Sequence, residues 1–265
     1  MINLDLRGKR ALVTGATRGL GYAMAARLAQ AGAVVGVNGR SEATVTKAVD
    51  DLRRDHPDLS FVAVVADLGR DDGALVALDQ FPDPDILVNN IGVYQSGSVL
   101  DTAESVWAEH FDANVLTGVR ITRGVLPRML ERRWGRVIFI ASDAAVAVPT
   151  DMVHYAASKT ALLSVARGFA KATAGSRITV NSVIVGPSET DALKAFVSEV
   201  VGPDLPWPQA QAEYMRTHRP LSVIQRLIRP EEVANMVVYL SSELSSATTG
   251  GALRVDGGYV DSILP

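Results

Sequence analysis

Short runs of apolar residues alternate along the chain with longer amphipathic stretches. The apolar runs lie at residues 10–13, 34–37, 61–65, 86–88, 137–140, 180–185 and 253–255. Strands that are buried on both faces read as nearly continuous apolar runs, and the amphipathic stretches between them are typical of helices. The alternation therefore predicts an α/β protein with about seven strands in a parallel sheet, covered by helices on both faces.

One region departs from this alternation. Residues 186–229 contain five prolines, at positions 187, 203, 206, 208 and 220, with helical patches near 191–200 and 209–217. A long proline-punctuated insertion in a compact domain is often a segment that covers a binding site. Because no repeat, low-complexity segment or interdomain linker is visible elsewhere, we expect residues 1–265 to form a single domain that carries this insertion.

Composition narrows the class of protein. Of the 265 residues, 48% are hydrophobic, which is ample for a sizeable core. No apolar run reaches the length of about 18 residues that a membrane-spanning helix needs. Residues 1–7 lack a basic start followed by an apolar stretch, so no signal peptide is expected. The absence of cysteine excludes disulfides, thiolate metal sites and cysteine catalysis. A cytoplasmic enzyme is the expectation.

The charge distribution gives no case for nucleic acid, because the net charge is −3. A short basic cluster is best explained as a solvated helix end, where cations are favoured; it comprises Arg128, Arg132, Arg133 and Arg136. The four histidines are scattered along the chain, so no metal site is predicted.

Candidate chemistry comes first from Tyr155 and Lys159, which lie four residues apart in a helix-like stretch. Positions i and i+4 share one face of a helix, and a nearby cation lowers the pKa of a phenol toward useful proton transfer. Ser142 follows the apolar run that ends at Ala141, so its hydroxyl could hold a substrate oxygen beside the phenol. Taken alone, the pair is weak evidence, because such a pair is more often a half-buried tyrosine beside a solvated lysine.

A glycine-rich turn lies near the N-terminus. The apolar run at 10–13 leads into Thr14–Gly21 and then into a helix-like stretch, with glycines at 15, 19 and 21. Strand, glycine turn and helix in this order allow close approach of a pyrophosphate to free helix amides. The spacing is G-x-x-x-G-x-G, which differs from the commoner G-x-G-x-x-G, and a purely structural turn is the alternative.

Together these features resemble the short-chain dehydrogenase/reductase family. The likeness is carried by Thr14–Gly21, Asn89–Gly92, Asn114, Ser142, Tyr155 and Lys159, and it extends from Lys9 to Gly258. The general character is closest to the 3-oxoacyl-acyl-carrier-protein reductase-like branch. The resemblance implies a Rossmann-type doubly wound fold, a nicotinamide cofactor and a catalytic set of Asn114, Ser142, Tyr155 and Lys159. It also implies a homotetramer (or dimer) formed through helices near residues 103–132 and 152–174.

The resemblance further implies which residues hold the cofactor: Gly15, Thr17, Arg18, Gly19, Leu20, Gly21, Arg40, Asp67, Leu68, Asn90, Ile91, Gly92, Tyr155, Lys159, Gly186, Ser188 and Thr190. Asp67 would bind the adenine amino group, with capping of the following helix as its alternative. Ser188 and Thr190 would hold the nicotinamide carboxamide, and Thr190 could also be a helix N-cap. Two residues depart from the family pattern, Ile91 in place of alanine and Val185 in place of proline.

The segment after the second strand favours NADP(H) over NAD(H). Sites that prefer NAD place an acid there for the ribose hydroxyls. Here the position carries Arg40, and no acid occurs until Glu42. Arg40 and Arg18 can both pair with a 2′-phosphate, which an aspartate would repel.

The implied mechanism is hydride transfer between the nicotinamide and a carbonyl or secondary alcohol. Tyr155 would exchange a proton with the substrate oxygen, while Lys159 lowers the tyrosine pKa and holds the ribose. Ser142 would orient the substrate, and Asn114 would support a water and Lys159. Besides Ser142 and Tyr155, the expected substrate contacts are Asp143 and Tyr94.

Two other functions remain open. The first is an enzyme that works mainly in the oxidative direction on a sugar or secondary alcohol. The second is a protein that senses NADP(H) or acts as a scaffold without turnover. The presence of all four catalytic-type residues argues against the second, since a sensor could lose any of them.

Overall fold

The fold is a seven-stranded parallel sheet with the strand order β3-β2-β1-β4-β5-β6-β7. The computed structural model describes residues 4–263, so the first three residues of the N-terminal segment considered above lie outside it. All the predicted strands are confirmed: β1 Arg10–Val13, β2 Val34–Gly39, β3 Phe61–Val65, β4 Ile86–Asn89, β5 Gly135–Ser142, β6 Ile178–Val185 and β7 Ala252–Val255. The chain reverses its direction of travel across the sheet between β1 and β4, which is where doubly wound sheets bind ligands.

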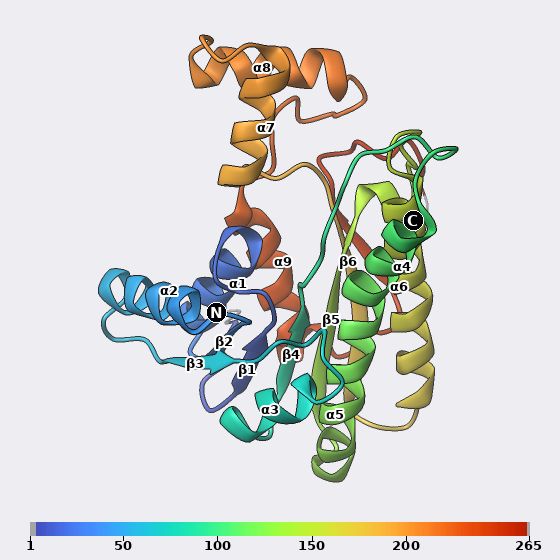
Figure 1. Ribbon diagram of the computed structural model, residues 1–265. Coiled ribbons are helices and arrows are strands. Elements are labelled where there is room, and N and C mark those ends of the chain that lie inside the picture. The colour runs from blue at the N-terminus through green and yellow to red at the C-terminus, as the bar shows by residue number, and fades with distance from the viewer. Residues whose placement is uncertain (1–3, 264–265) are drawn as a thin grey trace.

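Helices cover both faces of this sheet (Figure 1). They are α1 Gly19–Gln30, α2 Glu42–Asp55, α3 Gly73–Gln80, α4 Glu104–Phe111, α5 Thr117–Arg132, α6 Val153–Ala172, α7 Asp191–Val201, α8 Trp207–His218 and α9 Pro230–Ser241. One core packs α1, α2 and α9 against the sheet, and a second core packs α3, α5 and α6 against the opposite face. The prediction of a three-layer Rossmann-type fold is therefore confirmed.

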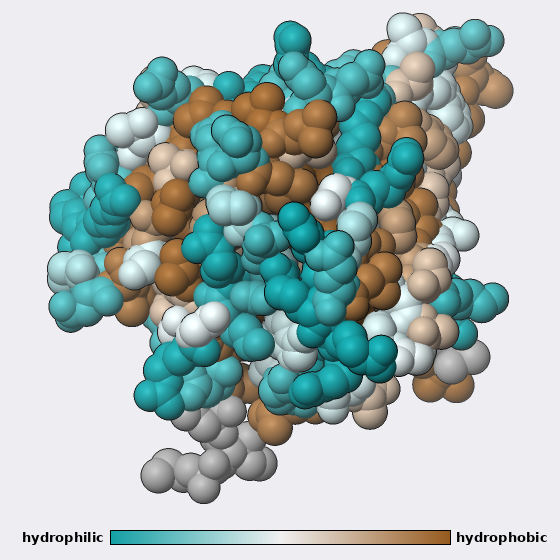
Figure 2. All heavy atoms as spheres, turned by 90° about the horizontal axis from the view of Figure 1, so that it is seen from below, coloured by the Kyte–Doolittle hydropathy of each residue, from teal (hydrophilic) through white to brown (hydrophobic). Residues whose placement is uncertain are grey.

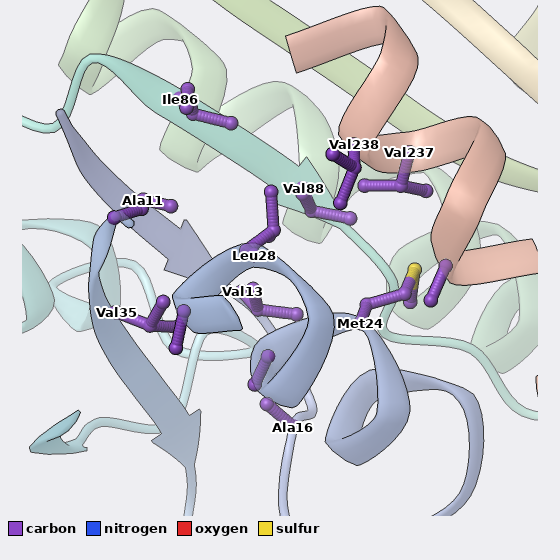
Figure 3. Packing of buried hydrophobic residues seen from close by; sticks show 14 of the residues in the cluster. Ala11, Val13, Ala16, Met24, Leu28, Val35, Ile86, Val88, Val237 and Val238 are labelled. Carbon is purple, nitrogen blue, oxygen red and sulfur yellow. The ribbon is translucent and has the colours of Figure 1, made fainter. Parts of the chain in front are cut away.

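The first core fixes the position of α1 above the central strands. Met24 and Leu28 of α1 pack among Val13 of β1 and Val88 of β4, with Val237 of α9 beside them (Figure 3). All five side chains are fully buried. Each buried side chain of this size contributes about 1.5–3 kcal/mol, so the start of α1 is held firmly against the carboxyl ends of the strands.

The stretch from residue 103 to 132 is not one continuous helix. A five-residue π-helix, Asp112–Leu116, separates α4 from α5. Single π-turns inside helices frequently mark functional sites. This one places Asn114 in the interior, where the side chain is buried.

The insertion, residues 186–229, contains α7 and α8 at the two predicted positions. These helices pack on each other through a small core of their own: Val197, Ala210, Tyr214, Met215 and Leu227. In Figure 1 the two helices project from the body of the molecule. The insertion therefore adds a separate packing unit beside the carboxyl end of β6.

The basic cluster is not wholly a solvated helix end. Arg136 lies in β5 and is only 1% exposed, which contradicts that interpretation for this residue. Its guanidinium donates to the carbonyls of Ser242, Gly135 and Arg177 and lies 3.5 Å from Glu243. These contacts tie the start of β5 to the segment that follows α9.

Hydrophilic and hydrophobic side chains are interspersed on the face that Figure 2 shows. Among residues 4–263, no helix is both long and apolar enough to span a membrane. Over the same residues, no cluster of histidine and carboxylate side chains has the arrangement of a metal site.

Candidate functional site

The glycine turn between β1 and α1 is built for close approach. Gly15 and Gly19 have φ angles of 60° and 57°, the left-handed region that favours glycine. A Cβ atom at Gly21 would lie 2.4 Å from the carbonyl oxygen of Gly15, so no other residue fits there without a backbone shift. The turn therefore leaves a cradle of backbone atoms at the start of α1.

Asn90 and Asn38 hold this turn in place. The Asn90 side chain donates to the carbonyls of Thr14 and Gly15, both at 3.0 Å, and its backbone N–H donates to the Thr14 hydroxyl at 2.9 Å. Asn38 is fully buried; its side-chain oxygen accepts from the Gly15 N–H at 3.4 Å, and its side-chain nitrogen donates to the carbonyls of Val64 and Ala66. The sequence analysis missed Asn38, although a lone amide inside an apolar strand was the available signal.

The start of α1 is suited to an anion. No side chain caps this end, and its first turn carries no acidic residue. Arg18 and Arg40 are exposed nearby, and within residues 4–263 neither forms an ion pair. Free amides at a helix N-terminus and two cations fit the phosphates of a dinucleotide.

Other expected cofactor residues border the turn in different ways. Thr17 lies against Gly39, Ile91 lies against Gly15, and Leu20 packs partly into the first core. Asp67 is exposed and accepts a hydrogen bond from the Gly69 N–H at 3.0 Å. It does not cap α3, which begins at Gly73.

Leu68 differs from its neighbours because its side chain is buried in the second core. It therefore offers a cofactor only backbone atoms.

The loop after β6 also approaches the glycine turn. Thr190 is the N-cap of α7, accepting from the Leu193 N–H at 3.3 Å, as its alternative role predicted. Its methyl group would nevertheless lie 3.4 Å from a Cβ at Gly19, so the residue also borders the glycine turn. The Ser188 hydroxyl donates to the Gly186 carbonyl at 3.0 Å. Val185, which replaces proline, simply continues β6 and pairs with Val255.

Ser142 and Tyr155 meet where β5 ends and α6 begins. Ser142 is the last residue of β5, and Tyr155 lies in the first turn of α6. Burial raises the pKa of Tyr155 to about 12, while a hydrogen bond with the Ser142 hydroxyl acts in the opposite direction. The phenol is therefore protonated at neutral pH.

Lys159 lies one turn beyond Tyr155 and is buried. Its ammonium donates to the Ile140 carbonyl at 3.1 Å and lies 5.9 Å from the centre of the Tyr155 ring. Burial lowers the pKa of Lys159 to about 8. Ser142 is the main group that lowers the pKa of Tyr155 here, and the effect of Lys159 on that pKa stays a prediction.

Asn114 connects the π-helix to the catalytic-type residues. Its side chain accepts from the Val93 N–H at 2.7 Å and donates to the Val93 carbonyl at 3.0 Å and to the Ser158 hydroxyl at 2.8 Å. Ser158 in turn donates to the Tyr155 carbonyl at 2.6 Å. The sequence analysis missed Ser158, whose position three residues after Tyr155 was the only signal.

Gly92 leaves space for the Lys159 ammonium and the Asn114 side chain. A Cβ atom there would lie 3.0 Å from the Lys159 ammonium and 3.3 Å from the Asn114 side-chain oxygen. The structure thus brings Asn114 and Lys159 to one glycine, although the Asn114 amide is bonded to Val93 and Ser158.

The two other expected substrate contacts, Tyr94 and Asp143, differ in exposure. Tyr94 is 62% exposed and makes an edge-on contact with Tyr155, with the two ring centres 6.4 Å apart. Asp143 is buried and its Oδ2 atom lies 4.0 Å from Arg219, a residue of the insertion that the sequence analysis missed. No local pattern indicated this contact, because the two residues are far apart in the chain.

Comparisons with known proteins agree with this geometry. The sequence model of the family described as enoyl-(acyl carrier protein) reductase matches residues 15–260. The uncharacterized oxidoreductase YvaG of Bacillus subtilis (strain 168) is 43% identical over 99% of this chain and 100% of its own length.

Two solved structures share the fold over nearly their whole length. L-sorbose reductase from Gluconobacter frateurii, complexed with NADPH and L-sorbose, is 28% identical with a TM-score of 0.91, covering 99% of this chain and 100% of that one. A 3-oxoacyl-[acyl-carrier protein] reductase from Brucella melitensis with bound NAD is 25% identical with a TM-score of 0.84, covering 98% and 94%. With its glycine turn, its parallel sheet and these relatives, the chain belongs to the short-chain dehydrogenase/reductase family of oxidoreductases, which transfer a hydride to or from a nicotinamide cofactor.

Proposed function

We propose that the protein is an NADP(H)-dependent oxidoreductase that interconverts a carbonyl and a secondary alcohol, with Tyr155 as the general acid and base. The observation that carries this proposal is the meeting of Ser142, Tyr155 and Lys159, with the Lys159 ammonium against Gly92. The nicotinamide, when bound, supplies or accepts the hydride.

The residues of the chain would move and hold the proton. Because the pKa of Tyr155 is raised to about 12, its hydroxyl is protonated at neutral pH and can donate to a carbonyl oxygen during reduction. The Ser142 hydroxyl would hold that oxygen, and the Lys159 ammonium would stabilise the phenolate that remains. In the oxidative direction Tyr155 would take the proton back from the alcohol.

Asn114 would be a positioning residue that does not itself transfer a proton. Through Ser158 and Val93 it ties the start of α6 to the loop after β4, which holds Tyr155 and Lys159 in place. We propose that Gly92 and the other cofactor residues named above then border the dinucleotide, with Ser188 and Thr190 at its nicotinamide end.

Arg18 and Arg40 support NADP(H) as the preferred coenzyme. Both are exposed beside the start of α1, and Arg40 stands where an acid would bind the ribose hydroxyls of NAD. Solved relatives contain either NADPH or NAD, so the preference rests on these two arginines.

The insertion would cover the substrate, within a single domain formed by residues 1–265. We also propose a homotetramer, which follows the resemblance to the family, and a cytoplasmic location. An enzyme that works mainly on a sugar or secondary alcohol in the oxidative direction is the second candidate, favoured by the L-sorbose-bound relative. A sensor or scaffold is disfavoured because the four catalytic-type residues are all present.

Coenzyme consumption by the purified protein tests this proposal. NADPH and NADH would each be offered with ketones, diketones, β-ketoacyl thioesters and quinones, and alcohols and sugars would be tested in reverse. Turnover with NADPH preferred is the expected result. Tight NADPH binding without turnover on any of these classes would contradict it and favour the sensor.

A further inference from the structure

A partly buried ion pair lies next to the catalytic-type serine. Arg219 follows the last residue of α8, and its Nη1 atom lies 4.0 Å from Oδ2 of Asp143. Asp143 directly follows Ser142, and its residue is only 6% exposed. The contact therefore joins the insertion to the end of β5 at the place where a substrate would sit.

Each partner of this pair has an unused hydrogen-bonding atom. The Asp143 Oδ1 atom accepts from the Ser142 hydroxyl and from the Ala144 N–H, both at 2.9 Å. By contrast, Oδ2 of Asp143 and Nε of Arg219 are buried and have no hydrogen-bond partner among the residues that the structure describes. Buried polar atoms are normally paired, so a further group is expected between them.

The surroundings hold the arginine in place. Its guanidinium lies over the ring of Tyr259, 4.9 Å from the ring centre. Burial disfavours its charge, but Asp143, Tyr214 and Tyr259 more than offset this and raise the pKa of Arg219. Arg219 is therefore a fixed, charged donor, while the adjacent carboxylate is an acceptor.

These atoms also lie close to the reacting centre. The charges of both Asp143 and Arg219 act on the phenol of Tyr155. Ser142, which the proposed mechanism places on the substrate oxygen, bonds directly to Asp143. A group held between Asp143 and Arg219 would therefore belong to the same small molecule as the reacting carbonyl.

The paired donor and acceptor select the chemistry of that group. A carboxylate would attract Arg219 but would be repelled by Asp143, and a hydrocarbon would leave both buried atoms unpaired. A hydroxyl group suits both, because it accepts from Arg219 and donates to Asp143.

Resting on the proposed function, we propose that Asp143 and Arg219 bind a hydroxyl on the carbon beside the reacting carbonyl, so that the substrate is an α-hydroxy ketone or, in reverse, a vicinal diol. Arg219 is then a specificity residue that the insertion contributes. The proposal covers any small molecule that presents this pair of oxygens.

A matched pair of ketones tests the inference. The initial rates of NADPH consumption would be compared for 2-hydroxycyclohexanone and cyclohexanone, which differ only in the hydroxyl. We expect kcat/KM of the intact enzyme to be about 10- to 100-fold higher for the hydroxy ketone, as for a hydrogen bond to a charged group. In Arg219→Met this ratio should fall toward 1, and in Arg219→Lys it should be intermediate.

Arg216→Met is the control, since Arg216 lies in the last turn of α8, three residues before Arg219, is exposed and, among residues 4–263, pairs only with Glu213. It should leave the ratio unchanged. Circular dichroism and NADPH binding would check that each variant folds. Comparable kcat/KM for both ketones in the intact enzyme, or an unaltered ratio in folded Arg219→Met, would overturn the inference and leave the proposed function standing. Failure to reduce either ketone or any other carbonyl would overturn both.

Discussion

At the scale of single residues, burial sets the protonation of the two central groups. It raises the pKa of Tyr155 to about 12 and lowers that of Lys159 to about 8. Tyr155 thereby keeps its proton at neutral pH, whereas Lys159 keeps its charge only at a cost to the folded state. The sequence indicated both residues through their spacing, but it could not indicate burial, which depends on the packing of α6 against β5.

Replacing Lys159 by methionine should therefore stabilise the fold while abolishing turnover. An apolar side chain of similar length removes a buried charge, so the free energy of unfolding at pH 7 should rise by about 1–3 kcal/mol. Because the ordinary lysine pKa of 10.5 falls to about 8 on folding, the unfolded chain binds more protons between these values. Stability of the intact protein should then rise with pH across this window, closing the gap to the variant.

Urea unfolding of both proteins at pH 7 and above pH 10 would measure this difference. A Lys159→Met variant less stable than the intact protein at pH 7 would show that the ammonium is net stabilising.

The proposed coenzyme preference can be tested at one of its two arginines, Arg40. Replacing Arg40 by aspartate should lower kcat/KM for NADPH by about 10- to 100-fold, because a charge-assisted bond becomes a repulsion. The same variant should use NADH at least as well as the intact enzyme does, since an acid can accept the ribose hydroxyls. Equal losses with both coenzymes would instead indicate general damage to the site.

At the scale of elements, the strands were predictable and the π-helix was not. The strands are buried on both faces, so their apolar runs stand out in the sequence. The stretch from Asp112 to Leu116 contains no glycine or proline that would signal a break. The π-helical geometry accompanies the hydrogen bonds between the Asn114 side chain and the Val93 backbone. These contacts join distant parts of the chain.

The close packing of the glycine turn at the start of α1 can be tested by a substitution at Gly21. In Gly21→Ala the new Cβ would lie 2.4 Å from the Gly15 carbonyl oxygen and 2.8 Å from Ala16 Cα. Such overpacking should lower the free energy of unfolding by about 1–3 kcal/mol and weaken NADPH binding.

Gly168→Ala is the matched control, because a Cβ at Gly168 in α6 meets nothing within 4 Å. It should raise stability by up to about 1 kcal/mol and leave binding intact. Thermal unfolding with and without NADPH measures both effects. If the two substitutions shifted stability equally, the turn would not be closely packed.

At the scale of the whole molecule, the insertion shows where sequence reasoning ends. Its two helices were predicted as helical patches, but the contact of Arg219 with Asp143 was not predicted. That contact depends on how the insertion folds back onto the carboxyl end of the sheet. A single sequence gives no signal for such long-range pairs.

Assembly is the corresponding prediction at this scale. Phe111, Leu116 and Leu130 are partly exposed along the α4–α5 segment, where the family resemblance predicts a subunit contact. Packing against other copies would bury these side chains. Light scattering after size exclusion should give about four times the chain mass of 28.2 kDa, or twice if only one interface forms. A mass equal to that of one chain would refute this assembly.

The central claim is that the Tyr155 hydroxyl transfers the proton. Tyr155→Phe removes only that oxygen, so the single most direct measurement is its kcat together with its NADPH dissociation constant. Loss of turnover by about 100-fold or more, with NADPH binding nearly unchanged, is the predicted result for a general acid and base. Turnover close to that of the intact enzyme would contradict the account.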